Sequence, residues 1–214
     1  MSKYKCIIFD CDGVLVDSES IGNQILVDMA NELGANINLD YGFEHFKGNA
    51  LSVVANHVSK LINKPLPNNF IEEYRRRSYQ AFKENISPVE NIEHVLQNLR
   101  IPFCVASSGP EEKIRLNLSL TGLLSYFEDK IFSCYTIQKW KPEPDIFLLA
   151  AKTMNFLPKE CLVIEDSITG VEAAKKGGFT VFAYTAHDYN DELSKIADKT
   201  FVNMLNLPCL LTEN

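Results

Sequence analysis

Short, uninterrupted apolar runs occur near the start of the chain and recur through its second half, at residues 5–9, 102–106, 161–164 and 180–184. Runs of this length without polar alternation are typical of strands buried on both faces of a parallel sheet. Helical patterns lie between them at 110–120, 145–154 and 168–176, the last ending at a pair of glycines. This alternation predicts an α/β protein with a Rossmann-like parallel sheet and helices on both faces.

The stretch 18–84 interrupts the alternation, because it carries helical periodicity and no convincing strand. Its first stripe consists of apolar residues four positions apart: Ile21, Ile25, Met29 and Leu33. Residues 53–61 and 70–82 predict further helices, and Pro88 disfavours helix at the residue before it. We therefore expect a helical cap, residues 18–84, inserted into a core formed by residues 1–17 and 85–214.

Composition and charge indicate a globular protein and disfavour nucleic-acid-binding and membrane-spanning classes. With 46% hydrophobic and 23% charged residues, the chain of 214 residues has enough apolar material for a packed core. Its 21 basic and 28 acidic residues give a net charge of −7, which disfavours nucleic-acid binding. No apolar run approaches the ~20 residues of a membrane-spanning helix, and the apolar stretch after Lys5 is too short for a signal peptide. We expect a cytoplasmic protein without a membrane partner, and a monomer by default.

The six cysteines support the same compartment. They contain no C-x-x-C pair and mostly lie inside apolar runs, as small buried hydrophobic residues do. Neither disulfides nor a zinc site are expected, which is typical of a reducing cytosol.

Polar residues follow the ends of the predicted strands, at positions 10–13, 107–110, 139–142 and 165–167. In open parallel sheets, ligands bind beyond the carboxyl ends of the strands, so these segments are expected to share one edge. They supply acidic side chains, a hydroxyl and a lysine. Carboxylates suit Mg²⁺, which is usually shared with phosphate oxygens, so the pattern predicts a divalent cation beside a phosphate site.

The spacing of Asp10 and Asp12 indicates two different roles. If Asp10 ends a strand and the chain then turns, Asp10 can face the substrate while Asp12 reaches the leaving group. Carboxylates in unlike environments can act as nucleophile and proton carrier. A calcium loop beginning at Asp10 fails, because it would need a ligand, a glycine and a glutamate where the chain has Val14, Leu15 and Ile21.

Each segment also has a simpler interpretation. Ser107 and Ser108 could cap the helix that follows Pro110, residues 165–166 could cap the helix near 168, and Lys141 could be a surface lysine. The placement of all four segments on one predicted edge favours a shared site.

The same segments carry a family resemblance. FDCDGVLVDSE (9–19), ASSG (106–109), KPEPD (141–145) and VIEDSITG (163–170) resemble, in order, the four motifs of the haloacid dehalogenase-like hydrolase superfamily. More narrowly, the chain is similar to the phosphatase and β-phosphoglucomutase-like branch, whose members carry a helical cap.

The resemblance implies a role for each motif. Asp10 would attack phosphorus and form a transient aspartyl phosphate, and Asp12 would protonate the leaving oxygen and then activate water. Lys141 would neutralise charge on Asp10 and the phosphoryl group. Residues of the second motif would bind the phosphoryl oxygens at a helix start, which suits an anion: Ser107, Ser108 and Gly109.

The resemblance also implies one cofactor, Mg²⁺. Asp10, the backbone carbonyl of Asp12 and Asp166 would hold the ion. Glu165 would bind through a water molecule or support the direct ligands.

The cap of the family closes over the site and excludes bulk water. Lys47 and Gly48 are the candidate substrate-binding residues of this cap, because a cationic side chain stands beside a flexible position; a solvated lysine is the alternative. Residues 75–77 are three arginines about 100° apart around a helix, so at most two can face a site. The resemblance favours a small phosphorylated metabolite as substrate, a sugar phosphate or a sugar-acid phosphate such as 6-phosphogluconate.

Other activities fit less well. A mutase of the same branch would carry a histidine shortly after Asp17, where this chain has Ser20, Ile21 and Gly22. A dehalogenase would lack Asp12. A receiver-like signalling module also gathers aspartates, lysine and Mg²⁺ at a sheet edge, but it needs neither a helical cap nor an acid/base two residues after the phosphorylated aspartate.

Overall fold

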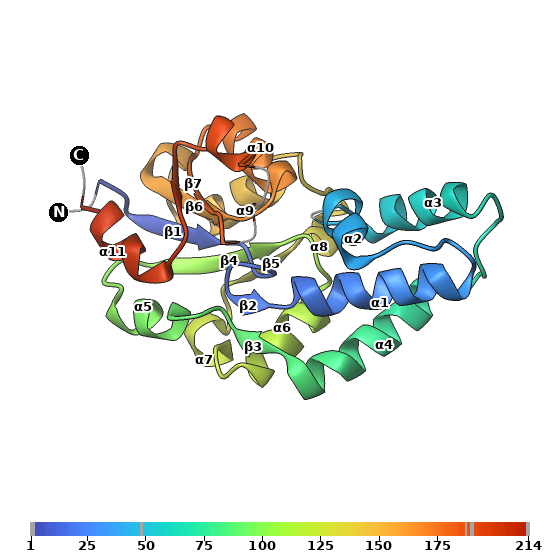
Figure 1. Ribbon diagram of the computed structural model, residues 1–214. Coiled ribbons are helices and arrows are strands. Elements are labelled where there is room, and N and C mark those ends of the chain that lie inside the picture. Colours follow the sequence, from blue (N-terminus) through green and yellow to red (C-terminus); the bar gives the residue numbers. More distant parts are fainter. Residues whose placement is uncertain (1–2, 48, 187, 189–190, 213–214) are drawn as a thin grey trace. The chain divides into compact units, whose positions relative to one another are not determined.

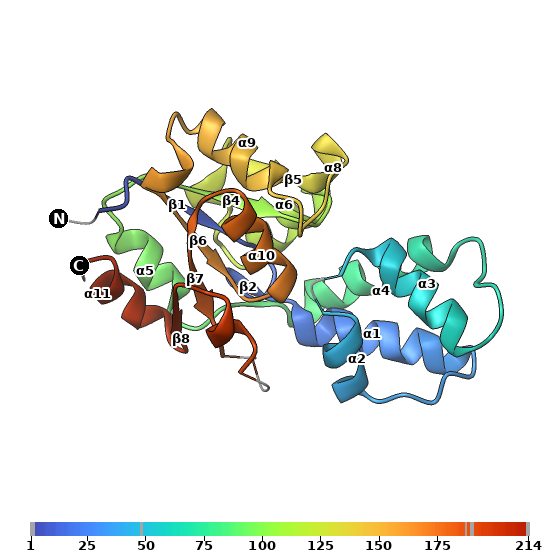
Figure 2. The same ribbon diagram turned by 90° about the horizontal axis from the view of Figure 1, so that it is seen from above.

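The computed structural model describes residues 3–47, 49–186, 188 and 191–212 and divides the chain into two compact units (Figures 1 and 2). Unit 1 takes the chain up to Asp17 and again from Ser87, and unit 2 comprises Ser18–Ile86. The return to unit 1 therefore lies two residues beyond the position 84 expected from the sequence.

A six-stranded parallel sheet forms the centre of unit 1, in the order β5-β4-β1-β6-β7-β8. The strands are β1 (Cys6–Phe9), β4 (Phe103–Ser107), β5 (Ile131–Ser133), β6 (Cys161–Glu165), β7 (Thr180–Tyr184) and β8 (Lys199–Phe201). Every residue of β1 and β6 is buried, which explains the uninterrupted apolar sequence of β1 and of β6 up to Ile164. The predicted Rossmann-like parallel sheet is confirmed.

Helices pack on both faces of this sheet (Figures 1 and 2). They are α5 (Ile92–Asn98), α6 (Glu111–Leu120), α7 (Leu124–Phe127), α8 (Cys134–Ile137), α9 (Asp145–Thr153), α10 (Ile168–Lys176) and α11 (Leu207–Leu210). One layer contains α9 and α10, whose apolar residues form a core cluster with Ile8 of β1. On the other layer, the ring of Phe103 contacts those of Phe9 and Phe127 in edge-to-face geometry.

Several short elements were missed by the sequence pattern. The strands β5 and β8 have only three residues each, too few to show a periodicity. A two-stranded ribbon is a further difference: Ser87 and Pro88, where the sequence indicates only that helix is disfavoured, form β3 and pair antiparallel with β2 (Val16–Asp17). Asp17 lies opposite Ser87, so the chain leaves and re-enters unit 1 at adjacent points.

Unit 2 is built from four helices, α1 (Glu19–Glu32), α2 (Leu39–His45), α3 (Leu51–Leu61) and α4 (Phe70–Asn85). Its core contains Leu26, Val27, Met29, Ala30, Phe46, Val54, Val58 and Phe70. The helix α1 packs against α2 and α4, and α3 packs against α4. The three predicted stripes correspond to α1, α3 and α4, whereas the seven-residue α2 was not predicted.

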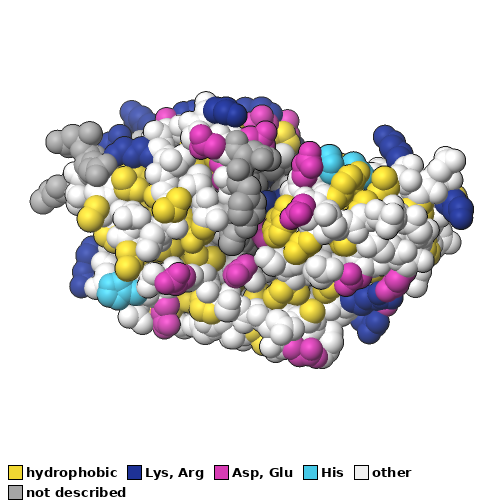
Figure 3. Space-filling view, viewed as in Figure 1, with side chains coloured by type: hydrophobic (Ala, Val, Ile, Leu, Met, Phe, Trp, Pro, Cys, Tyr) yellow, Lys and Arg dark blue, Asp and Glu magenta, His cyan; other side chains and the backbone are white. Residues whose placement is uncertain are grey.

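Ion pairs join α4 to its neighbour α1. The guanidinium of Arg77 lies 2.5 Å from Glu32 of α1 and 2.7 Å from Glu73, and Arg76 also contacts Glu73 at 2.7 Å. The space-filling view shows basic and acidic side chains next to one another where α1 and α4 run (Figure 3). The arginines at 76 and 77 thus have acidic partners within unit 2. Within the described part of the chain, no helix is both long and apolar enough to cross a membrane.

Candidate active site

Asp10 stands at the carboxyl end of β1, in the middle of the sheet. Its backbone N–H donates to the carbonyl of Ile164 at 2.9 Å, so the ladder between β1 and β6 continues to this residue. The side chain is enclosed, with the residue only 7% exposed. The sheet therefore fixes the backbone of the predicted nucleophile.

A tight turn follows, and Gly13 is essential to it. Gly13 has a φ of +79°, in the left-handed region that favours glycine. A β-carbon at Gly13 would overlap the carboxylate of Asp166. The glycine thus permits the turn and lets Asp166, from the end of β6, approach the β1 loop.

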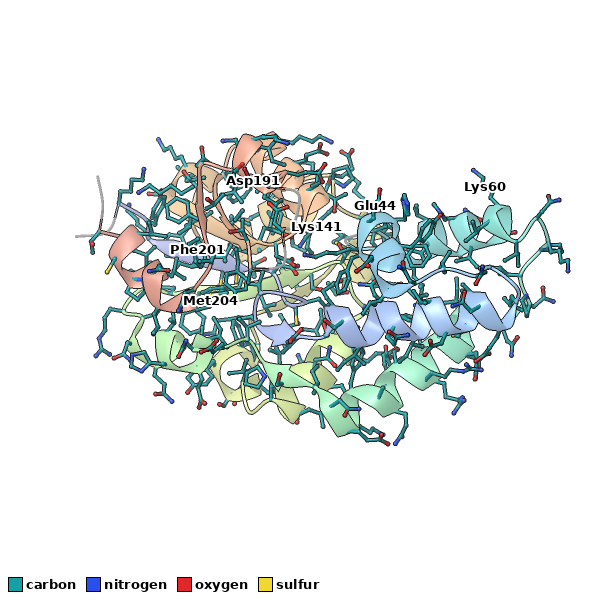
Figure 4. The ribbon with its side chains drawn as sticks, viewed as in Figure 1. Glu44, Lys60, Lys141, Asp191, Phe201 and Met204 are labelled. Carbon is teal, nitrogen blue, oxygen red and sulfur yellow. The ribbon has the colours of Figure 1, made fainter. Side chains whose placement is uncertain are left out.

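Lys141 lies inside the site, so its interpretation as a surface lysine is wrong. Its side chain is 3% exposed, and its Nζ lies 2.5 Å from Asp10 Oδ1 and 2.6 Å from Glu165 Oε1. The ammonium also donates to the carbonyl of Ala106 at 3.2 Å and lies 4.8 Å from the ring centroid of Phe147. Figure 4 labels Lys141 beside the strand ends. One cation thus links Asp10, which follows β1, with the ends of β4 and β6.

Glu165 is held by a dense set of donors. Its Oε2 accepts from the backbone N–H of Asp166 at 2.8 Å and from both the N–H and the hydroxyl of Ser167 at 2.9 Å. Ser167 itself caps α10, accepting from the N–H of Gly170. The alternative in which residues 165–166 cap this helix is therefore wrong. Glu165 instead connects Lys141 to the loop that carries Asp166.

Ser107 and its successors form a second loop at this edge. Ser107 is 1% exposed, and its hydroxyl accepts from the N–H of Gly109 at 3.1 Å. Ser133, at the end of β5, donates its hydroxyl to the Gly109 carbonyl at 2.6 Å. Pro110 is the N-cap of α6 and no side chain bonds there, so neither Ser107 nor Ser108 caps this helix. Ser133 had no sequence signal, because it ends a strand too short to be predicted.

Asp12 has its own cationic partner, which the sequence pattern does not predict. The Nζ of Lys113, in the first turn of α6, lies 2.8 Å from Asp12 Oδ2. The two side chains are 20% and 15% exposed. A lysine in the first turn of a helix faces the unfavourable end of the helix dipole, and this unusual position is the signal that could have identified it.

The charges of the site shift the pKa values of its central pair. Burial raises the pKa of Asp10 well above its ordinary value, Lys141 opposes this, and three neighbouring carboxylates raise it further. Burial alone would lower the pKa of Lys141, but the carboxylates of Asp10 and Glu165 outweigh it and hold the ammonium charged. The site carries an excess of negative charge that a bound cation would relieve.

A cation could be held by carboxylate oxygens already near one another. One oxygen each from Asp10, Glu165 and Asp166 lie within 4.8 Å of one another, and all three residues are buried. Hard oxygen donors of this kind suit Mg²⁺, so the residues present fit the expected cofactor.

The predicted site residues of unit 1 thus converge. Gly109 belongs to the same cluster, because the position of a β-carbon on it lies 3.5 Å from Ser107 Oγ and 3.8 Å from Asp12 Oδ2. The two remaining candidates, Lys47 and Gly48, belong to the cap segment of the sequence. Lys47 belongs to unit 2 and is half-buried, and Gly48 lies outside the described residues.

Comparison with known proteins decides the family. The sequence matches the haloacid dehalogenase-like hydrolase family over residues 7–184. The chain belongs to this family. It is 34% identical over 209 residues to 6-phosphogluconate phosphatase of Escherichia coli (strain K12), a match that covers 97% of this chain and 95% of that protein.

Two crystal structures of family members share the fold. A haloacid dehalogenase-like protein from Agrobacterium tumefaciens str. C58 has a TM-score of 0.88 and 28% identity, over 97% of each chain. A hydrolase of the same family from Deinococcus radiodurans R1, crystallised with phosphate and sodium, has a TM-score of 0.81 and 26% identity, over 99% of this chain and 96% of that one. The resemblance seen in the motifs is confirmed, and the chain is a phosphatase, a phosphoric monoester hydrolase.

Proposed function

We propose that the protein is a Mg²⁺-dependent phosphatase of a small phosphorylated metabolite and acts through an aspartyl phosphate on Asp10. The observation that carries the proposal is the enclosed contact of Asp10 with Lys141, beside the carboxylates of Glu165 and Asp166. Asp12, two residues after Asp10, supplies a second carboxylate in a different environment. A buried nucleophile, a fixed cation and a separate acid/base suit phosphoryl transfer through a covalent aspartyl phosphate.

The reaction proceeds in two displacements at phosphorus. A carboxylate oxygen of Asp10 bonds to phosphorus while the bond to the leaving oxygen breaks, and Asp12 gives that oxygen a proton. Asp12 then takes a proton from water, whose oxygen attacks phosphorus and releases Asp10 and inorganic phosphate. The two carboxylates divide nucleophilic and proton-transfer chemistry between them.

Other residues stabilise the phosphoryl group during both steps. Lys141 opposes the rise in the pKa of Asp10, which favours the ionised nucleophile, and balances charge as it builds on the phosphoryl oxygens. The loop of Ser107, Ser108 and Gly109 offers a hydroxyl and backbone N–H groups to the same oxygens. The bond from Ser133 to Gly109 holds this loop in place.

The proposed Mg²⁺ ligands are Asp10, Asp166 and the backbone carbonyl of Asp12. Glu165 already accepts hydrogen bonds from Lys141, Asp166 and Ser167, so we assign it an indirect part. When bound, Mg²⁺ supplies positive charge that orients the phosphate and lowers the repulsion between two anions. A chain of net charge −7 depends on such local positive charge to bind an anionic substrate.

We propose a sugar phosphate or sugar-acid phosphate as substrate, with 6-phosphogluconate the first candidate. The similarity to the Escherichia coli phosphatase named for that substrate supports it. Unit 2 is the proposed cap, and Lys47 and Gly48 are its proposed substrate-binding residues. If Lys47 selects the substrate, Lys47→Ala will lower kcat/KM unequally across sugar phosphates, and an equal effect on all of them would refute the assignment.

The test is phosphate release from a panel of sugar phosphates and sugar-acid phosphates, with Mg²⁺ or with EDTA. We expect turnover only with the metal, and none above background for Asp10→Asn. Asp129→Asn, which changes an exposed aspartate, is the matched control. Full activity of Asp10→Asn, or turnover in EDTA, would refute the mechanism. An isomeric sugar phosphate formed without inorganic phosphate would identify the mutase alternative.

A further inference from the structure

Lys113 is a charged side chain of the site to which the mechanism above gives no role. It belongs to α6 and lies 101 positions from Asp12 in sequence, yet its Nζ lies 2.8 Å from Asp12 Oδ2. We propose that Lys113 is a positioning residue, whose ammonium holds the Asp12 carboxylate in the orientation required for proton transfer at the leaving oxygen. The inference rests on the proposed acid/base role of Asp12.

The ion pair between Lys113 and Asp12 is largely shielded from solvent. Exposed ion pairs contribute little, because solvent screens them and both side chains lose freedom. Here, four-fifths or more of each side chain is covered. The Cδ of Lys113 lies 3.5 Å from the position that a β-carbon on Gly109 would occupy, so the aliphatic stem packs over the phosphate loop. Because both side chains are largely covered, solvent screens their contact less than it screens an exposed ion pair.

The two aspartates of the motif are anchored separately. Lys141, from the loop before α9, contacts Asp10, whereas Lys113, from α6, contacts Asp12. Two carboxylates two residues apart repel each other and would tend to turn away. A separate cation for each one fixes both orientations without making their environments alike. Lys113 also lies in the first turn of a helix, where its positive charge interacts unfavourably with the helix dipole. The ion pair with Asp12 offsets this unfavourable interaction.

A direct role in substrate binding is the main alternative. The ammonium lies 2.8 Å from the proposed proton donor to the leaving group, and a cation there could also bind an anionic substrate directly. The two roles predict different effects of replacing Lys113 on kcat/KM as the leaving group is changed. If Lys113 positions Asp12, its loss lowers kcat/KM when the leaving oxygen needs a proton. The loss has little effect when the oxygen leaves as a stabilised anion. If Lys113 binds the substrate, its loss lowers kcat/KM for both kinds of leaving group.

The experiment compares kcat/KM for an alkyl phosphate and for p-nitrophenyl phosphate, because kcat/KM reports steps up to leaving-group release. For Lys113→Met, we expect a loss of at least about 10-fold on the alkyl phosphate, a fraction of the ~10²–10⁴ that general acid catalysis supplies. We expect a change below about 3-fold on the aryl phosphate, and partial recovery in Lys113→Arg. Arg115→Met, which removes an exposed ion pair with Glu111 on the same helix, is the control and should change neither value.

A second measurement tests whether Lys113 acts through Asp12. In an Asp12→Asn background, Lys113→Met should cause no further loss on the alkyl phosphate, because the partner it positions is already inactive. Lys113→Gln replaces Lys113→Met if circular dichroism shows that the latter is unfolded. Equal losses on both substrates, or a loss that persists in the Asp12→Asn background, would overturn the inference. Retained turnover in Asp10→Asn would instead refute the proposed function, so the two failures are distinguishable.

Discussion

The carboxylate of Glu165 occupies the space beside Gly170 that a β-carbon would fill. Gly170 lies in the first turn of α10, where its N–H donates to Ser167. Alanine is ordinarily favoured over glycine inside a helix by about 1 kcal/mol. The glycine is thus retained against helix propensity because the carboxylate that binds Lys141 needs the space.

Gly170→Ala should therefore lower activity in spite of its better helix propensity. Overpacking of this kind costs about 1–3 kcal/mol, which exceeds the gain in propensity. Displacing Glu165 would also loosen Lys141, so we expect kcat to fall by at least about 10-fold, since Lys141 acts on the charge of the reacting group. Urea unfolding and steady-state kinetics measure the two effects. Ile168→Ala, at an exposed position of the same turn, should leave kcat unchanged; an active, stabilised Gly170→Ala would contradict the argument.

Removing Lys141 should affect both stability and catalysis. Lys141→Met leaves the buried carboxylates of Asp10 and Glu165 without their cation, and such a loss typically costs about 3–5 kcal/mol. We expect kcat to fall by about 10²–10³-fold, the scale of a lost charge-stabilising group. Urea unfolding without metal and phosphate-release kinetics are the measurements. Lys139→Met is the matched control, because this nearby lysine has a 59% exposed side chain paired with Asp145. Similar behaviour of the two variants would refute the assigned role.

Mg²⁺ should stabilise the folded protein by binding at the acidic cluster. At a concentration 100 times its dissociation constant, a ligand adds about 2.7 kcal/mol to the free energy of unfolding. For a chain of this size we expect Tm to rise by about 5–10 °C. Asp166→Asn should abolish most of the rise, whereas Asp129→Asn should retain it. Differential scanning calorimetry with Mg²⁺ or EDTA tests this, and an unchanged rise in Asp166→Asn would place the metal elsewhere.

Acid should weaken unit 2 through Glu73. Hydrogen bonds from Arg76 and Arg77 lower the pKa of Glu73 from 4.5 to about 2. Because the folded pKa is depressed, its stabilising contribution is complete above the unfolded value of 4.5 and is lost as pH falls towards about 2. The difference in unfolding free energy between the wild type and Glu73→Gln should therefore shrink as the pH is lowered from 5.

Urea unfolding followed by circular dichroism at several pH values from 5 downwards measures this difference. Glu72→Gln, at the exposed neighbouring position, serves as the control and should show no such trend. A constant difference between the wild type and Glu73→Gln across this range would show that the ion pairs on α4 do not contribute in solution.

The sequence by itself determined four of the six strands, their parallel arrangement and most of the catalytic edge. The strands β1 and β6 can be recognised in the sequence because burial on both faces favours runs of consecutive apolar residues. In a parallel sheet the polar residues after such strands must meet at one edge, so Asp10 and residues 165–166 could be placed together before any contact was known. The motif order then indicated the reaction class.

Only the tertiary structure decided which side chains contact one another at that edge. The contact of Lys113 with Asp12 joins residues 101 positions apart, and the bond from Ser133 to Gly109 depends on the pairing of β5 with β4. The requirement for glycine at position 170 depends on where the Glu165 carboxylate lies. Periodicity records which residues are buried along an element. It does not record which partners face each other across elements, because packing and charge select them only once the chain has folded.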